Sequence, residues 1–151
     1  TPQTPDVGDP PVLGEAFRAH PGSAAERIDE RLAAQTAIGV RRDRLEAHLV
    51  KRGALVNGAV APRVATVTNV SLRGVRGEEW VAALDIEGVC AASGAACSSG
   101  LAEASPVVTA MYRDSPWRAR ATLRLSLGPE TSDEDVEGAC RALDMVLDRF
   151  E

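Results

Sequence analysis

Residues 93–100 (SGAACSSG) place a single cysteine, Cys97, among residues with very small side chains. Small neighbours leave a thiol accessible and allow the backbone to move. The hydroxyls of Ser93, Ser98 and Ser99 can donate hydrogen bonds to a thiolate, which is the reactive form of cysteine. This pattern suits a nucleophilic thiol carried on a tether. The alternative is a glycine- and serine-rich loop that merely contains a cysteine.

The thiol of Cys97 requires a nearby cation or helix dipole to lower its pKa, and the loop itself contains no cation. The activating group is therefore expected from another part of the structure. The other two cysteines, Cys90 and Cys140, lie in apolar patterns, and we expect both to be small hydrophobic core residues. Three cysteines without CxxC spacing argue against a disulfide framework and against a zinc site, and they fit a reducing cytoplasm.

Arg124 is a second residue suited to chemistry, because a guanidinium group can hold a carboxylate through two parallel hydrogen bonds. It lies in the alternating stretch 119–127 (ARATLRLSL), which predicts a strand. The alternative role is an ion pair with a surface acid. Arg120 is expected on the same sheet face as Arg124, four residues away, as a structural residue. Lys51, the one lysine of the chain, is expected to be solvated.

The elements that must position these residues follow from hydrophobic periodicity and capping signals. Helices are expected over 23–52, 77–85 and 107–112, with a last helix that opens at Ser132. Strands are expected over 64–72, 88–92 and 119–127, and residues 1–22 read as an irregular lead-in rich in proline. We therefore predict one α+β domain over 1–151, with a three- or four-stranded, mainly antiparallel sheet and helices packed on one side.

Composition narrows the classes of function. The chain has 151 residues and a net charge of −5, which argues against direct binding of nucleic acid. No apolar run approaches the ~18–20 residues that span a bilayer, so no membrane association is expected. The first residues, Thr1-Pro2-Gln3-Thr4, lack the basic and apolar regions of a secretory leader.

An ordered set of motifs resembles the C-terminal small domain of cysteine desulfurases of the nitrogen-fixation and iron–sulfur-cluster type, within the class-V aminotransferase family. The family has a Ser-Gly-Ser-Ala-Cys-Ser/Thr-Ser run where this chain has SGAACSSG. The resemblance extends in order through Leu13-Gly14-Glu15-Ala16-Phe17, Asn69-Val70-Ser71, Leu84-Asp85-Ile86-Glu87-Gly88, the 120–128 stretch and Thr131-Ser132-Asp133-Glu134-Asp135. It covers nearly the whole chain.

The resemblance implies specific roles. Cys97 matches the nucleophile that takes sulfur from L-cysteine as a persulfide, while alanine leaves. Arg124 matches the arginine that holds the substrate carboxylate. Thr4 matches a threonine that reaches across a homodimer interface to the phosphate of pyridoxal phosphate, although Thr1-Pro2-Gln3 replaces the family's Arg-Ser/Gly-Gly before it. Asn69 is expected to be a structural residue at a strand end. A sulfur-acceptor protein is the implied partner.

The large domain that binds pyridoxal phosphate in this family has no counterpart in the sequence. The chain alone is therefore expected to be inactive. Three explanations are ranked in order: a piece of a full enzyme, half of a split enzyme whose large domain is a separate subunit, or a free-standing module. The last includes a sulfur carrier, or a non-catalytic interaction module, that kept the loop and lost the desulfurase chemistry.

Overall fold

The computed structural model describes residues 24–94 and 104–150, with side chains from Ile28 onward. Cys97, Thr4 and the expected lead-in over 1–22 lie outside the described residues. The chain divides into two compact units, Thr1–Leu32 and Ala33–Glu151. The second unit contains the sheet, the core and the pocket described below. No helix in the described part of the chain has both the length and the apolar character needed to cross a bilayer.

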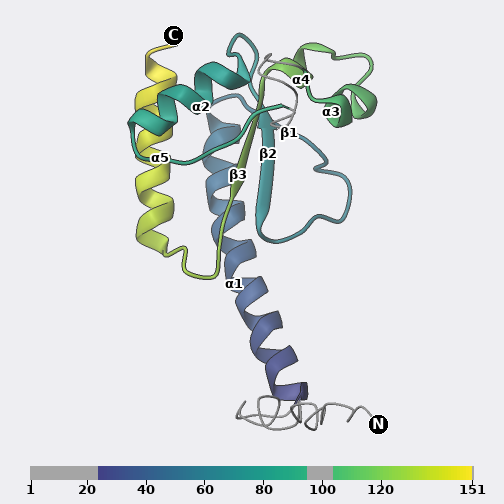
Figure 1. The fold of residues 1–151 in the computed structure, drawn as a ribbon, viewed down its shortest axis with the longest axis vertical. Coiled ribbons are helices and arrows are strands. Elements are labelled where there is room, and N and C mark those ends of the chain that lie inside the picture. The colour runs from purple at the N-terminus through teal and green to yellow at the C-terminus, as the bar shows by residue number, and fades with distance from the viewer. Residues whose placement is uncertain (1–23, 95–103, 151) are drawn as a thin grey trace, which may run out of the picture. The chain divides into compact units, whose positions relative to one another are not determined.

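A three-stranded antiparallel sheet forms the centre of the second unit (Figure 1). Its strands are β1 (Leu55–Val56), β2 (Val67–Ser71) and β3 (Thr122–Ser126), in the order β1-β2-β3. At the free edge of β3, Ala92 forms an isolated bridge with Arg124. The predicted α+β class with a small antiparallel sheet is confirmed.

The helices lie close to the positions predicted, except for one short helix at 117–120 that was not expected. They are α1 (Ala24–Lys51), α2 (Gly77–Ile86), α3 (Pro106–Met111), α4 (Trp117–Arg120) and α5 (Asp133–Asp148). The predicted start of the last helix is confirmed, because the Ser132 hydroxyl accepts from the Asp135 backbone amide at 3.1 Å. The Asp135 carboxylate accepts in turn from the Ser132 backbone amide at 2.8 Å, and this hydrogen bond lowers the pKa of Asp135.

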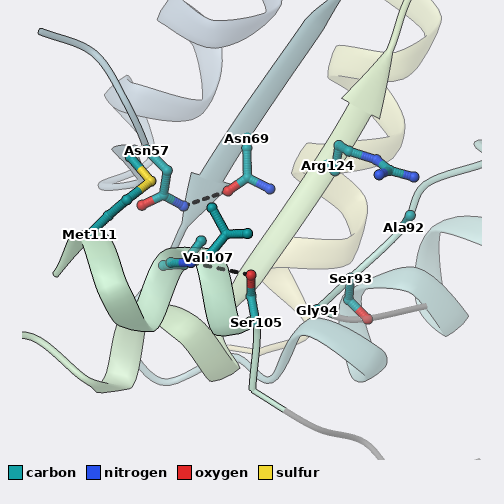
Figure 2. A pocket seen from close by; sticks show the side chains of 10 residues that line it. Asn57, Asn69, Ala92, Ser93, Gly94, Ser105, Val107, Met111 and Arg124 are labelled. Carbon is teal, nitrogen blue, oxygen red and sulfur yellow. Dashed lines mark hydrogen bonds between the residues drawn. The ribbon is translucent and has the colours of Figure 1, made fainter. Parts of the chain in front are cut away.

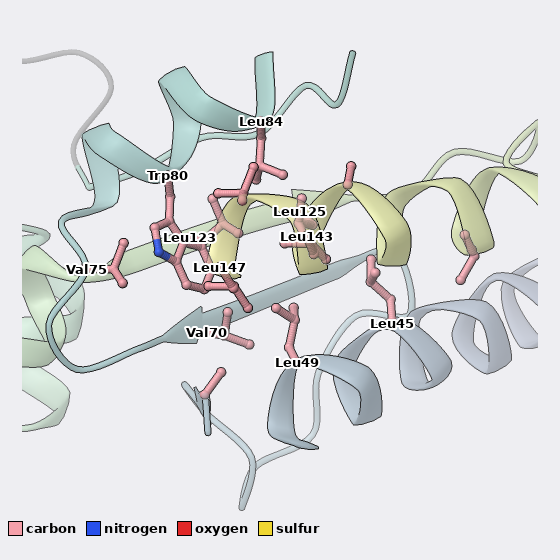
Figure 3. Packing of buried hydrophobic residues seen from close by; sticks show 14 of the residues in the cluster. Leu45, Leu49, Val70, Val75, Trp80, Leu84, Leu123, Leu125, Leu143 and Leu147 are labelled. Carbon is pink, nitrogen blue, oxygen red and sulfur yellow. The ribbon is translucent and has the colours of Figure 1, made fainter. Parts of the chain in front are cut away.

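The hydrophobic core lies between one face of the sheet and the helices α1, α2 and α5 (Figure 3). Val70 of β2 and Leu123 of β3 are paired across the strands, and both are fully buried in this core. The helices contribute the other large members: Leu45 and Leu49 from α1, Trp80 and Leu84 from α2, and Leu143, Val146 and Leu147 from α5. Because side chains alternate along a strand, the neighbours of Val70 and Leu123 face the opposite side of the sheet.

Beside this core, hydrogen bonds among charged and polar side chains link α1 to β2. Arg63 donates two hydrogen bonds to the Glu46 carboxylate, at 2.6 and 2.9 Å, and the Thr68 hydroxyl donates a third at 2.7 Å. The hydrogen bonds from Arg63 are the main reason that the pKa of Glu46 is lowered. Glu46 is therefore a structural carboxylate, held ionised by its partners.

The predicted strand over 119–127 was wrong in its first half. Residues 117–120 form α4, and β3 begins only at Thr122, so Arg120 lies on a helix and does not share a sheet face with Arg124. Pro116 stands at the N-cap with φ −63°, a dihedral already suited to a helix start. The apolar alternation of this stretch did not reveal that proline-initiated turn.

Two further expectations also need correction. The strand predicted over 88–92 is reduced to the single bridge at Ala92, and Cys90 is exposed rather than a core residue. Gly88, with φ +79°, ends the turn after α2, and the short segment that follows pairs with β3 only at Ala92. Cys140 is partly buried against the core, as expected, and this burial raises the pKa of its thiol.

Candidate functional site

A pocket of about 450 Å³ lies on the face of the sheet that points away from the core (Figure 2). Asn69 of β2 and Arg124 of β3 belong to this face, because they alternate with the buried Val70 and Leu123. The remaining walls come from the residue after β1, from the segment 92–94 and from α3 with its N-cap: Asn57, Ala92, Ser93, Gly94, Ser105, Val107, Val108 and Met111.

Arg124 gives the pocket its chemical character. Its backbone exchanges hydrogen bonds with Ala92, at 2.7 and 3.0 Å, which fixes the position of its Cα at the pocket rim. Its side chain is exposed, and within residues 28–94 and 104–150 no acid or other side chain pairs with it. Arg124 also carries the only formal charge among the described residues that line the pocket. The site therefore suits an anion such as a carboxylate.

The segment that leads to Cys97 is held against β3. The Gly94 backbone amide donates to the Thr122 hydroxyl at 3.0 Å, two residues from Arg124. On its other side the segment packs against Gly77 at the start of α2. A Cβ at Gly77 would lie 2.5 Å from the Thr122 carbonyl oxygen and 2.8 Å from Ser93 Cβ. Only glycine lets α2, β3 and the segment approach this closely.

The far end of the Cys97 loop is also fixed beside the pocket. The Ser105 backbone amide donates to the Ala119 carbonyl at 2.9 Å, and the Ser105 hydroxyl caps α3 by accepting from Val108 at 3.3 Å. Gly94 and Ser105, on either side of the nine residues 95–103, both line the pocket. Cys97 itself falls within 95–103, outside the described residues.

A buried polar network supports the floor of the pocket. Arg118 is 9 % exposed; its Nε donates to Asn57 Oδ1 at 3.0 Å, and its Nη2 donates to the Val56 carbonyl at 2.9 Å. The guanidinium carbon lies 3.7 Å from the centroid of the Tyr112 ring, a cation–π contact. Asn57 continues the network to Asn69 through a hydrogen bond of 2.5 Å.

Sequence reasoning missed this network. Asn57 and Arg118 both lie outside the helices and strands expected from the sequence, and neither was expected at the site. Asn69 was expected at a strand end, yet it is the middle residue of β2 and lines the pocket. No periodic pattern marks such residues, because a buried arginine is recognisable only once its partners from distant segments are known.

The described residues do not form a binding site for pyridoxal phosphate. The lysine that such a site requires is absent from the pocket: Lys51 is exposed in the last turn of α1 and lines a different cavity with His48 and Asp144. Within the described part of the chain, no cluster of three or more acidic, histidine or cysteine side chains could hold a metal ion. The described pocket therefore provides one guanidinium group and hydrogen-bonding side chains, and no lysine.

Comparisons with known proteins give matches that cover most of the chain. The aminotransferase class-V family matches residues 10–138. A cysteine desulfurase of Bradyrhizobium diazoefficiens is 37 % identical over 131 residues, covering 85 % of this chain and 33 % of the relative. The cysteine desulfurase NifS of Azotobacter vinelandii is 33 % identical over 130 residues, covering 83 % of this chain and 32 % of the relative.

Solved structures show the same fold. A NifS-like protein superimposes with a TM-score of 0.66 at 20 % identity, covering 81 % of this chain and 30 % of that chain. A NifS-like protein from Rickettsia africae gives a TM-score of 0.61 at 18 % identity, covering 76 % and 29 %. The chain thus spans about a third of the length of the curated relatives it matches.

Proposed function

Because the chain belongs to the class-V aminotransferase family, we propose that it is the small domain of a pyridoxal-phosphate-dependent cysteine desulfurase, with Cys97 as the sulfur-accepting residue. The observation that carries this proposal is the position of Arg124. Its guanidinium, which has no side-chain partner among the described residues, shares a pocket with Gly94, the last described residue before Cys97. Cys97 is three positions after Gly94, so their Cα atoms are at most about 11 Å apart.

The pocket supports the binding of L-cysteine through its carboxylate. A bidentate contact with Arg124 would fix one end of the substrate, and the walls formed by Val107, Val108 and Met111 would exclude water from part of it. The substrate would then be presented to a thiol on the adjoining segment. This division of labour, with a fixed binding group and a nucleophile on a tether, is the reason we favour desulfurase chemistry.

The proposed reaction transfers the sulfur atom of L-cysteine to Cys97. The Cys97 thiolate attacks the sulfur of the substrate, an S–S bond forms, and the C–S bond of the substrate breaks. Cys97 is left as a persulfide, and the electron pair of the broken bond stays on the substrate carbon, which is protonated and released as alanine. That electron pair requires an electron sink, which the described residues do not provide and which we assign to pyridoxal phosphate held by a large domain.

The remaining roles belong to the same proposal. We assign the lysine of the cofactor site to a large domain or a separate subunit, and the terminal sulfur of Cys97 to an acceptor protein. A homodimer, a cytoplasmic location and a contact of Thr4 with the partner's cofactor phosphate are supported only by the family resemblance. No nucleic acid or membrane takes part in this account.

A second candidate is a sulfur carrier that receives persulfide from another desulfurase. The anchoring of residues 92–94 and 105 around the Cys97 loop serves that role equally well. Arg124, to which no side chain in the described part of the chain is paired, favours the desulfurase, since a carrier has no need of a carboxylate-binding group.

The deciding experiment supplies a cofactor-binding large domain to this chain, in one polypeptide or as a separate subunit, and measures alanine formed from L-cysteine. The proposal predicts alanine production that requires both parts and is abolished by Cys97→Ser. Absence of alanine, combined with transfer of sulfur from another desulfurase to Cys97, would support the carrier instead.

A further inference from the structure

The side-chain amide of Asn69 presents its nitrogen, rather than its oxygen, to the pocket. This orientation follows from Arg118, whose guanidinium can only donate hydrogen bonds. Because Arg118 Nε donates to Asn57 at 3.0 Å, the atom of Asn57 that it meets must be the oxygen. The Asn57 nitrogen therefore points the other way, toward Asn69 and Ser71.

The orientation of the Asn57 amide in turn determines the orientation of the Asn69 amide. Asn57 Nδ2 donates to Ser71 Oγ at 2.8 Å and to Asn69 Oδ1 at 2.5 Å. The Ser71 hydroxyl donates its one hydrogen bond to the Arg118 carbonyl at 2.9 Å, so toward Asn57 it can only accept. Asn69 must then turn its oxygen toward Asn57, which leaves its NH₂ group on the pocket side. Figure 2 shows the Asn69 oxygen directed at Asn57 and its nitrogen on the side of Arg124.

Burial of the network disfavours the opposite orientation of the Asn57 and Asn69 amides. Arg118 is 9 % exposed, Asn57 7 % and Ser71 fully buried, so reversal of either amide would leave buried donors facing donors. Unpaired buried polar groups of this kind are strongly disfavoured. Among the described residues no hydrogen-bond acceptor contacts the Asn69 NH₂ group, and the pocket is the space in front of it.

We propose that Asn69 Nδ2 is a second hydrogen-bond donor to the carboxylate of the substrate, acting together with Arg124. Arg118 and Asn57 are positioning residues, which act by fixing the direction of the Asn69 amide. This inference rests on the proposed function, because it assigns a further contact to the same carboxylate. Two donors on adjacent strands would favour an α-carboxylate over a neutral or amine group at this position.

The contrasting role for Asn69 is purely structural: its oxygen would join β2 to Asn57, and its nitrogen would face solvent in the pocket without a ligand. Two substitutions together separate the two roles. In Asn69→Asp, one carboxylate oxygen still accepts from Asn57, while the pocket-facing donor becomes an anionic acceptor that also lies opposite Arg124. Asn57→Asp leaves position 69 uncharged and reverses its amide, so a structural role of Asn69 predicts a wild-type KM in that variant, whereas a carboxylate-binding role does not.

The test uses the holoenzyme formed by this chain with its large domain and measures kcat and KM for L-cysteine. For Asn69→Asp we expect KM to rise at least about 10-fold, since a charge-assisted hydrogen bond is lost and a repulsion is gained. Asn57→Asp should raise KM in the same direction, because the Asn69 amide must then reverse and turn its oxygen into the pocket. Ser71→Ala, which disturbs the same network without reversing either amide, should leave KM unchanged.

Inhibition by L-alanine and by ethylamine, its counterpart without the carboxylate, supplies an independent reading. The inhibition constant of L-alanine should rise in Asn69→Asp and that of ethylamine should not. An active wild-type enzyme whose Asn69→Asp variant keeps the wild-type KM and the wild-type L-alanine inhibition would overturn the inference and leave the proposed function standing. A wild-type holoenzyme that forms no alanine from L-cysteine would overturn the proposed function itself.

Discussion

Asn69 and Arg124 are directly opposed across β2 and β3, and they form a non-hydrogen-bonded pair of the antiparallel ladder. The backbone of Arg124 bonds outward to Ala92, and the Asn69 carbonyl accepts outward from the Asn57 amide at 2.8 Å. In such pairs the two side chains leave the sheet on the same face, with their Cβ atoms about 4.5–5.5 Å apart. The ladder register therefore fixes the spacing of the two Cβ atoms from which the amide and the guanidinium extend.

Replacement of Arg124 should weaken the binding of L-cysteine and leave the free energy of unfolding almost unchanged. Arg124→Ala should raise KM for L-cysteine by about 10- to 100-fold in the holoenzyme, the range expected for lost hydrogen bonds to a charged group. Because the side chain is exposed and unpaired among the described residues, the free energy of unfolding should change by less than about 0.5 kcal/mol. The exposed Arg120 on α4 is the matched control, and Arg120→Ala should leave KM unchanged. Equal effects of the two substitutions on KM would contradict the assignment of Arg124.

Gly77→Ala should destabilise the fold where α2 packs against β3 and Ser93. The added methyl would lie 2.5 Å from the Thr122 carbonyl oxygen, a backbone atom that cannot move away alone. Overpacking of this kind costs about 1–3 kcal/mol in the free energy of unfolding, which urea denaturation measures.

The matched control for Gly77 is Gly138 in α5. There the nearest atom to a new Cβ is Arg141 Nη2 at 3.8 Å, at the end of a flexible side chain. Gly138→Ala should therefore stabilise the chain by about 0.5–1 kcal/mol, because alanine is the better helix former. A stabilising Gly77→Ala would show that α2 and β3 do not approach as closely as described.

The ionisation of Glu46 should make the free energy of unfolding depend on pH. Since hydrogen bonds from Arg63 hold its folded pKa below the ordinary value of 4.5, the contribution of its carboxylate is fully present above about that pH. The contribution is lost as the pH falls through the lower folded pKa. Glu46→Gln should reduce the free energy of unfolding by about 1–3 kcal/mol at neutral pH, and the difference from wild type should shrink below pH 4.5.

The exposed Glu137, which lies 3.5 Å from Arg44, is a suitable control for Glu46. Its side chain is 59 % exposed, and Glu137→Gln should cost less than about 1 kcal/mol. A Glu46→Gln effect that stays constant down to acidic pH would rule out ionisation of Glu46 as its source.

The described cysteines should differ in reactivity toward alkylating reagents. Cys90 is exposed, whereas burial and the nearby Asp144 raise the pKa of Cys140. Because the thiolate is the reactive form, Cys140 should be modified more slowly than Cys90 at neutral pH in the folded chain, and the two rates should converge in denaturant. Quantitative mass spectrometry of the modified peptides measures both rates. Faster modification of Cys140 in the folded chain would contradict its placement against the core.

The periodicity of the sequence predicted those elements whose own side chains form the core. Val136, Leu143, Val146 and Leu147 repeat at helical spacing, and all four are buried where α5 packs against the sheet. The fold class follows from such patterns, because each amphipathic element must cover its apolar face. The same periodicity predicted a strand at Arg124, whereas the proposed role of Arg124 came from the family resemblance.

Other features depended on partners that periodicity does not identify. Cys90 looked apolar in its local sequence, yet its segment pairs with β3 only at Ala92 and leaves the thiol exposed. The orientation of Asn69 depends on Arg118, which lies 49 positions away in the sequence and acts through Asn57. A hydrogen-bonded relay between distant segments has no sequence period, so only the structure reveals it.

Isotope labelling of the transferred sulfur tests the assignment of Cys97 as the sulfur-accepting residue. The holoenzyme is incubated with L-cysteine carrying a heavy sulfur isotope, free thiols and persulfides are alkylated, and each cysteine peptide is analysed by mass spectrometry. The account predicts one heavy sulfur on the peptide that contains Cys97, none on Cys90 or Cys140, and loss of the label in Cys97→Ser. Alanine formation with the heavy sulfur on a different cysteine of this chain, or with no labelled cysteine in it, would contradict the role of Cys97.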